Sequence, residues 1–179
     1  TFTNWTDGTD SITINGNASA NILTGDELRA TIINGGDGAD TIIGGAGNDT
    51  LNGGAGDDNV TGGAGNDTIN GAGGTNTLAG GANDDTYIVN EGTVTINEAV
   101  GEGIDLVQTN KSSFFLGTNV ENLTYTGATA FFGVGTALDN VIIGGIGVDQ
   151  LEGRDGNDTL NDGGGASADA LFGGLGNDI

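Results

Sequence analysis

Four nonapeptides in direct succession decide the fold of this chain: GGDGADTII at residues 35–43, GGAGNDTLN at 44–52, GGAGDDNVT at 53–61 and GGAGNDTIN at 62–70. All four fit the pattern G-G-x-G-x-D-x-U-x, in which U is a large aliphatic residue. Two looser copies keep the register, GAGGTNTLA at 71–79 and GGANDDTYI at 80–88. A unit that recurs at a fixed short period predicts stacked repeats, in which each unit packs only on its neighbours.

The residue types within each unit predict its conformation. Glycine adopts positive φ without steric cost, so the first six residues suit a tight turn with inward-facing carbonyls. The segment x-U-x suits a short strand in which only U points inward, because side chains alternate between the two faces. One apolar side chain per unit forms a core only if units stack. Two units would make one coil, with parallel strands of successive coils about 4.8 Å apart.

This arrangement predicts columns of equivalent residues, one from each coil. The interior of one sheet would hold Ile42, Val60 and Leu78, and the other would hold Leu51, Ile69 and Tyr87. The predicted fold class is all-β, a parallel β-roll or β-helix solenoid with short strands and Gly-Asp turns.

The composition restricts the partners of the chain. Its 25 acidic and 3 basic residues give a formal charge of -22, which excludes nucleic acid and anionic lipid as partners and favours cations. Cysteine, histidine and methionine are absent, so disulfides and thiolate or imidazole metal sites are excluded. No apolar run approaches the roughly 20 residues of a membrane span, so no membrane insertion is expected.

The aspartates of the repeat should also stack, Asp40 over Asp58 and Asn76, and Asp49 over Asp67 and Asp85. Like charges at such spacing repel, so each column opposes folding unless a dication lies between its members. Calcium suits this position because it accepts six to eight carboxylate and carbonyl oxygens in flexible geometry. The pattern therefore predicts several bound calcium ions.

The rest of the chain carries weaker copies. The pattern returns at 144–152, 153–161, 164–172 and 173–179, although Arg154 replaces a glycine. Between the blocks, GEGIDLV at 101–107 keeps the spacing and makes Asp105 a candidate ligand. Asn21 and Asn140 stand where aspartate would, in coils expected to keep the shape without the metal. The aspartate columns should weaken at Asn76, be interrupted through the middle coils and resume at Asp149.

We expect one solenoid in four segments: entry or capping coils at 1–34, regular nonapeptides at 35–88, irregular enlarged coils at 89–143, and a second nonapeptide block at 144–179 that continues in a longer parent chain. The alternative is that residues 89–134 form a small separate β domain.

These nonapeptides resemble those of the RTX (repeats-in-toxin) family. The resemblance implies a parallel β-roll in which each calcium ion lies between one turn and the turn a coil later. Its ligands are then aspartate side chains and carbonyls of the glycine-rich stretch. The pairs would be Asp40 with Asp58, Asp49 with Asp67, Asp67 with Asp85, a weaker Asp58 with Asn76, Asp149 with Asp169, and Asp158 with Asp178. The carbonyl ligands would come from Gly36, Gly38, Gly45, Gly47, Gly54, Gly56, Gly63 and Gly65.

No enzyme is expected, because the repeat accounts for the carboxylates and no histidine, cysteine or G-x-S-x-G motif supplies a base or nucleophile. The resemblance implies a module of a type I-exported bacterial protein that folds on extracellular calcium, outside the cell or at its surface. It would form part of a surface layer, adhesin or fibre and could self-associate. The alternative is a secretion, folding or substrate-attachment module of a secreted enzyme or toxin.

Overall fold

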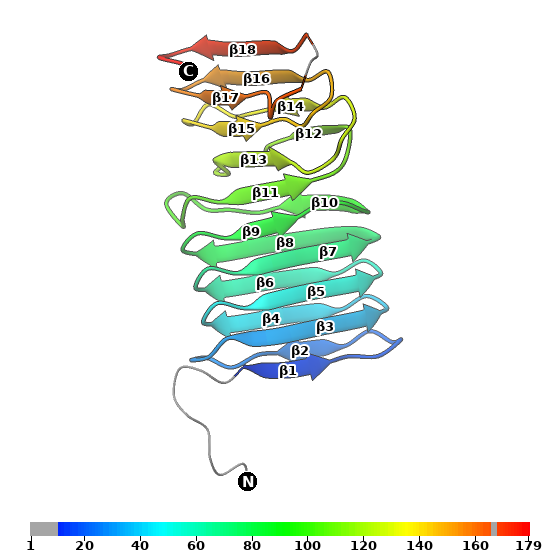
Figure 1. The fold of residues 1–179 in the computed structure, drawn as a ribbon. Coiled ribbons are helices and arrows are strands. Elements are labelled where there is room, and N and C mark those ends of the chain that lie inside the picture. The colour runs from blue at the N-terminus through cyan, green and yellow to red at the C-terminus, as the bar shows by residue number, and fades with distance from the viewer. Residues whose placement is uncertain (1–10, 166–167) are drawn as a thin grey trace.

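The structure, a computed structural model, describes residues 11–165 and 168–179. All of its regular elements in these residues are β-strands, which stack along one axis as a solenoid (Figure 1). Residues 1–10 of the expected entry segment lie outside the described residues. The predicted all-β parallel solenoid is confirmed.

The strands form three parallel sheets, named here sheets A, B and C. Sheet A has nine strands, β1 (Ile12–Asn15), β3 (Thr31–Asp37), β5 (Thr50–Ala55), β7 (Thr68–Gly73), β9 (Thr86–Ile88), β11 (Leu106–Thr109), β13 (Asn122–Tyr125), β15 (Val141–Ile143) and β17 (Thr159–Asn161). Sheet B has five strands, β2 (Ile22–Thr24), β4 (Thr41–Ala46), β6 (Asn59–Ala64), β8 (Thr75–Ala82) and β10 (Thr93–Ile96). Sheet C has four, β12 (Ser113–Phe115), β14 (Phe132–Val134), β16 (Gln150–Asp155) and β18 (Ala170–Leu175).

The register follows the predicted coil of two nonapeptides through the regular repeats. Leu51 pairs with Ile69 in sheet A, and Val60 pairs with Leu78 in sheet B. The spacing changes in the middle of the chain, where Leu106 pairs with Thr86 on one side and with Asn122 on the other. The coil from Thr86 to Leu106 is longer than a regular coil and the coil that follows it is shorter. The period that identifies the repeats is therefore lost there, while the strand pairing is kept.

The core is the pair of columns predicted from the U positions. Ile42, Val60 and Leu78 have no exposed surface, and Leu51, Ile69 and Tyr87 are at most 1% exposed. The core continues beyond the regular repeats through Val107, Leu123, Ile142 and Leu151. Burying each large aliphatic side chain contributes about 1.5–3 kcal/mol, so stacking these residues is the main apolar stabilisation of the fold.

The strands of the regular repeats are longer than the short x-U-x segments expected. β4 includes Gly44 and Gly45, and Gly45 pairs with Gly63 of β6. A Cβ on Gly63 would collide with the carbonyl of Gly45, so the ladder reaches into the turn only because glycine has no side chain.

The two faces of the solenoid differ in continuity. Sheet A runs from β1 to β17 without a break, whereas the opposite face divides into sheet B, which ends at β10, and sheet C, which starts at β12 (Figure 1). Sheet A therefore passes through residues 89–143. The division of the chain into four segments stays a prediction.

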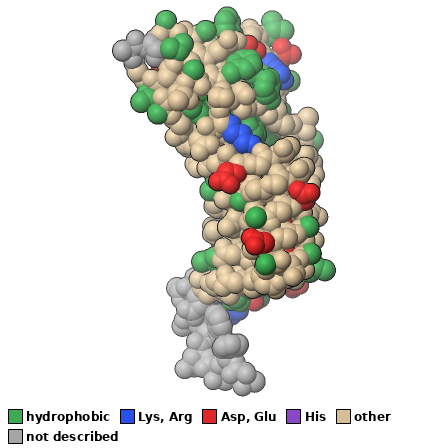
Figure 2. All heavy atoms as spheres, turned by 90° about the vertical axis from the view of Figure 1, so that its right-hand side faces the viewer, with side chains coloured by type: hydrophobic (Ala, Val, Ile, Leu, Met, Phe, Trp, Pro, Cys, Tyr) green, Lys and Arg blue, Asp and Glu red, His purple; other side chains and the backbone are tan. Residues whose placement is uncertain are grey.

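The edge of the solenoid drawn in Figure 2 shows only scattered acidic side chains and a gathering of hydrophobic ones towards the C-terminal coils. Many of the acidic groups are instead buried in the turns. Among the described residues, no helical segment has the length and hydrophobicity of a membrane span.

Candidate metal sites

The repeat aspartates point into the turns and are nearly inaccessible to solvent. Those at 40, 49, 58, 67, 85, 105, 149 and 158 are at most 3% exposed, as is Asn76. Asp169 and Asp178, in the last coils, are more accessible than these. Buried carboxylates need hydrogen-bond donors or a cation, because transfer of an unpaired charge from water costs several kcal/mol.

One oxygen of each carboxylate is satisfied by the neighbouring coil. The backbone N–H of Asp49 donates to Oδ1 of Asp67 at 2.7 Å, and that of Asp67 donates to Oδ1 of Asp85 at 2.7 Å. Asp40 donates in the same way to Asp58 at 2.9 Å. The other predicted pairs are joined by the same bond, Asp58 with Asn76 (2.9 Å), Asp149 with Asp169 (2.8 Å) and Asp158 with Asp178 (3.0 Å), as is Asp85 with Asp105 (2.9 Å).

The second oxygen has no partner in most of these turns. Among the described residues, a buried Oδ2 without a hydrogen bond is found in Asp40, Asp49, Asp58, Asp67, Asp85, Asp105 and Asp158. The first glycine of each repeat makes room for it: a Cβ on Gly35 would collide with Oδ2 of Asp40, and one on Gly62 with Oδ2 of Asp67. The repeat thus keeps space around an oxygen that it does not satisfy.

The turn at 71–76 reveals what fits in that space. Its aspartate is replaced by Asn76, whose side-chain Nδ2 donates to the carbonyls of Gly73 at 3.1 Å and Ala72 at 3.4 Å. Carbonyl oxygens of the turn therefore face the position that the second carboxylate oxygen holds elsewhere. In the aspartate turns whose Oδ2 has no hydrogen bond, a carboxylate oxygen takes the place of this amide, and carboxylate and carbonyl oxygens are the donors that calcium binds.

The glycines named as carbonyl ligands all lie in these turns. Gly36, Gly45, Gly54 and Gly63 have φ between 106° and 123°, and Gly38, Gly47, Gly56 and Gly65 between 102° and 143°. Positive φ at these two positions sets the orientation of the turn's peptide groups. Their role as ligands, like that of the aspartates, stays a prediction.

Burial opposes the charge of these carboxylates in the metal-free fold. Desolvation raises the pKa of Asp67 to about 6, that of Asp85 to about 7 and that of Asp105 to about 6, although the hydrogen bond from the preceding coil partly offsets it. The pKa values of Asp49, Asp58 and Asp158 are raised for the same first reason. A cation among these oxygens would remove the opposition.

The turn at 144–149 matches the glycine pattern but has a different backbone. Gly145 and Gly147 do not have positive φ, and the N–H of Gly145 donates to Oδ2 of Asp149 at 2.7 Å. In contrast, the turn of Asp158 keeps positive φ at Arg154 (84°) and Gly156 (121°), and its Oδ2 has no partner. The backbone conformation, rather than the match to the pattern, separates the two kinds of turn.

Two turns that have asparagine in place of aspartate also contain an internal hydrogen bond to that side chain. Oδ1 of Asn21 accepts from the N–H of Asn17 at 2.8 Å, and Oδ1 of Asn140 accepts from that of Thr136 at 2.6 Å. These coils keep the solenoid shape and have an internal donor, as the turn of Asp149 does, whereas the aspartate turns with an unpartnered Oδ2 have none.

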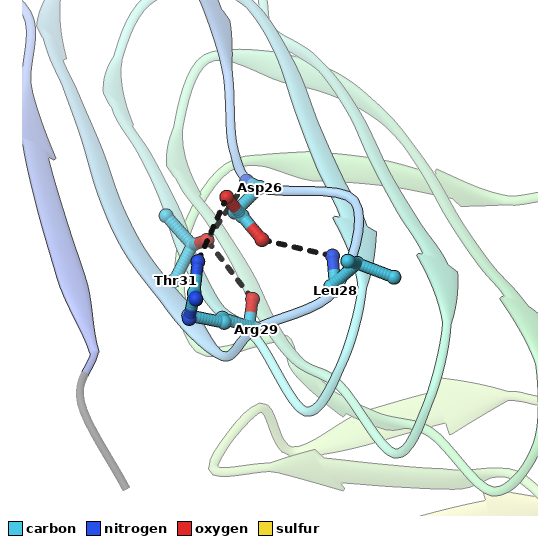
Figure 3. Close-up of polar contacts among 4 residues, drawn as sticks. All are labelled: Asp26, Leu28, Arg29 and Thr31. Carbon is cyan, nitrogen blue, oxygen red and sulfur yellow. Dashed lines mark hydrogen bonds and ion pairs between the residues drawn. The ribbon is translucent and has the colours of Figure 1, made fainter. Parts of the chain in front are cut away.

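The entry turn at 26–31 is also closed by its own side chains (Figure 3). Thr31 lies one coil before Asp49 and donates its N–H to Oδ1 of that residue at 2.6 Å, while its Oγ1 accepts from the N–H of Asp26 at 3.2 Å. Asp26 in turn accepts from the N–H of Leu28 at 2.9 Å and lies 3.7 Å from Nη1 of Arg29. This turn places a hydroxyl where the repeats place a carboxylate.

Two acidic residues were missed by sequence reasoning. Glu121 accepts the N–H of Asp105 at 2.9 Å through Oε2, and so holds the aspartate's place in the following coil. Glu98 is 8% exposed, and its oxygen lies within 4.8 Å of those of Asp85 and Asp105. Its position one regular coil after Gly80 could have identified Glu98, whereas the shortened coil hid Glu121.

The expected interruption of the columns is therefore correct on one face only. Beside sheet A the polar column continues from Asp85 through Asp105 and Glu121, and Asn140 donates its side-chain amide to the carbonyl of Glu121 at 2.9 Å. Asn140 then donates its N–H to Asp158 at 2.8 Å. On the other face, Val94 stands beside Asn76 and ends the column.

Comparison with protein families agrees with this geometry. The sequence matches the RTX calcium-binding nonapeptide repeat in four copies, at residues 29–60, 53–87, 134–161 and 164–179. These matches cover more than half of the chain and include most turns with an unpartnered carboxylate oxygen. Comparison with curated proteins gives no match. The chain belongs to the family of RTX calcium-binding nonapeptide repeats, and it is a calcium-binding structural module.

Proposed function

We propose that this chain is a module whose folding depends on calcium, within a protein exported from a bacterial cell. The observation that carries the proposal is the set of buried aspartate oxygens that have no hydrogen-bond partner in the described turns. Without a cation, folding must remove these carboxylates from water and bring their like charges close together. The net charge of -22 adds further self-repulsion. With calcium between the coils, binding and folding become one transition.

The dependence on calcium supports a link to export. Calcium is scarce in the cytosol and abundant outside cells, so the chain would stay unfolded within the cell and fold after passage through a type I exporter. Membership of the RTX family is in keeping with this route. The module would then act outside the cell or at its surface.

The ions would lie between successive coils. Each would take the free Oδ2 of one aspartate, carboxylate oxygens of the aspartate a coil later, and carbonyls of the glycine turn. The pairs Asp40–Asp58, Asp49–Asp67 and Asp67–Asp85 have the geometry best suited to this, since their turns combine positive φ with an unpartnered oxygen.

A calcium titration followed by far-ultraviolet circular dichroism tests the proposal. The chelated chain should give the spectrum of an unfolded chain and gain β-structure cooperatively as calcium is added, whereas magnesium should be much less effective because it demands octahedral geometry. A β-rich spectrum that does not change on chelation would refute calcium-dependent folding.

A structural role in a surface layer, adhesin or fibre is favoured by aromatic side chains on the outer surface of sheet C. Phe115 is 56% exposed and Phe172 is 55% exposed, on strands of the same sheet. Calcium-induced assembly, measured by light scattering and abolished by Phe115→Ser with Phe172→Ser, would support this role. A folded monomer at all concentrations would instead favour the alternative, a secretion or attachment module of a secreted enzyme or toxin.

A further inference from the structure

Glu98 stands where the repeat places its first glycine. Strand β10 pairs with β8 so that Ile96 lies beside Leu78, and two residues later Glu98 follows in the place of Gly80, one coil on. The N–H of Gly80 donates to Oε1 of Glu98 at 3.0 Å. In the regular repeats this position has no side chain, because the aspartate oxygen of the same turn occupies the space. Here the turn between Glu98 and Asp105 is longer than in the regular repeats, and it accommodates a carboxylate.

Three carboxylates meet at this point. One oxygen each from Asp85, Glu98 and Asp105 lie within 4.8 Å of one another, and the residues are 1%, 8% and 1% exposed. Oδ2 of Asp85, Oε2 of Glu98 and Oδ2 of Asp105 are all buried without a hydrogen-bond partner. Among the described residues, no other three acidic groups meet this closely.

The opposite oxygen of each carboxylate is held in place. Oδ1 of Asp85 accepts from the N–H of Asp67 at 2.7 Å, and Oδ1 of Asp105 accepts from that of Asp85 at 2.9 Å. Oε1 of Glu98 accepts from Gly80 and from the hydroxyl of Tyr87. Each group is thus fixed by one oxygen and keeps a second, buried oxygen without a partner within the same cluster, as a preorganised cation site requires.

Tyr87 departs from the repeat in a way that serves the same cluster. It occupies a U position, which elsewhere in the regular block holds an aliphatic residue, and it is fully buried. Its ring fills the core column while its hydroxyl donates to Glu98, so the substitution fixes the carboxylate that the next coil adds.

We propose that Asp85, Glu98 and Asp105 form a cation centre of three carboxylates, which extends the aspartate column and in which Glu98 is a ligand from outside the nonapeptide pattern. The proposal rests on the proposed function only in assuming that the chain folds with calcium. Three charges at low dielectric attract a hard cation more strongly than two, so this centre binds calcium, and trivalent lanthanides above all, more tightly than the repeat sites.

Counting bound calcium by native mass spectrometry tests the role of Glu98. Glu98→Gln keeps the shape and the hydrogen-bond acceptor but removes the charge, and Glu91→Gln, at an exposed position just before β10, is the charge-matched control. The centre predicts one ion fewer in Glu98→Gln than in the original chain and in Glu91→Gln. Equal ion counts and affinities in all three would show that Glu98 is a protonated hydrogen-bonding group instead. Absence of calcium from the original chain would overturn both this centre and the proposed function.

Terbium luminescence gives a second readout, which reports ion binding at the centre itself rather than calcium-dependent folding of the chain. Terbium bound at the centre lies close to Tyr87 and is sensitised by excitation of that ring, so the tightest luminescent phase should be lost in Glu98→Gln. Tyr87→Phe, which removes only the positioning hydroxyl, should keep the ion count at saturation and weaken calcium binding at this centre by about 10-fold, as loss of an outer partner of a ligand does. An unchanged terbium titration in Glu98→Gln would overturn the proposal.

Discussion

The two faces of the solenoid are built from the same nonapeptide but differ in continuity. Beside sheet A, each coil from Asp49 to Asp178 supplies a polar residue that hydrogen-bonds to its neighbour, and nine strands pair without a break. Beside sheet B the column ends where Val94 lies next to Asn76, and the sheet ends in that same strand, β10. On each of these faces, the column of hydrogen-bonded side chains and the pairing of strands therefore extend over the same coils.

The faces also differ in the number of buried carboxylate oxygens that have no hydrogen-bond partner. Among the described residues, unpartnered aspartate oxygens precede five strands of sheet A, at Asp49, Asp67, Asp85, Asp105 and Asp158, but only two strands of sheet B, at Asp40 and Asp58. The turn leading to β16 of sheet C satisfies Asp149 with an internal N–H. On the proposed function, the continuous face is therefore the one expected to depend more on calcium.

The largest expected effect comes from the core that both faces share. Leu51→Ala, between Ile33 and Ile69 in sheet A, should lower the free energy of unfolding in calcium by about 3–5 kcal/mol through the cavity that it leaves. Leu78→Ala should cost less, because its neighbour Ile96 is only partly buried and the end of sheet B can relax. Denaturant unfolding measures both, and equal losses would show that the break in sheet B does not loosen its core.

The next effect separates the two kinds of aspartate turn. Asp67→Asn should remove a cation ligand and lower the free energy of unfolding by about 2–3 kcal/mol at saturating calcium, since the stabilisation by a bound ligand is lost. Asp149→Asn should cost about 1 kcal/mol, the value of one hydrogen bond, because its second oxygen already has a donor.

Calcium distinguishes these two losses. The deficit of Asp67→Asn should grow as calcium is raised over the range in which the original chain gains stability, whereas that of Asp149→Asn should stay constant. A deficit of Asp149→Asn that grows equally with calcium would contradict the distinction drawn from the backbone of the two turns.

Adding a cation site beside sheet B, the face whose column ends at Asn76, is expected to have a smaller effect. Asn76→Asp replaces the amide that donates to Gly73 and Ala72 with a carboxylate, and should create a cation site with Asp58. Calorimetry should find one more calcium ion and about 1–2 kcal/mol more stability at high calcium, but a less stable fold without it. Asn66→Asp, at an exposed position in the preceding turn, adds the same charge and should leave the ion count unchanged.

Much of this arrangement was accessible from the sequence. The nonapeptide period predicted the two-unit coil, the columns of Ile42 and Leu51, and the pairing of the aspartates, because one repeated unit leaves little freedom in how copies stack. The role of Glu121 was not accessible, since one lengthened and one shortened coil shift the register on which the columns were counted, whereas Glu98 keeps the regular spacing from Gly80 but stands at a glycine position of the repeat. The peptide orientation at Gly145 was not accessible either, because a glycine permits both orientations and neighbouring coils decide between them.

The smallest expected effect concerns backbone strain, which both faces carry. Ala72 has a φ of 58° in a turn beside sheet B, and Arg154 has a φ of 84° in a turn beside sheet A, where the other regular turns have glycine. A non-glycine residue in this region costs about 1–2 kcal/mol, partly offset by the greater freedom of glycine in the unfolded chain. Ala72→Gly and Arg154→Gly should therefore each stabilise the fold by about 1 kcal/mol or less, whereas Ala55→Gly, at a residue without positive φ, should destabilise it. Thermal unfolding at fixed calcium measures the three variants. A loss of stability in Ala72→Gly equal to that of Ala55→Gly would mean that the left-handed conformation carries no strain, and that the alanine in this turn is as well suited to its position as the glycines it replaces.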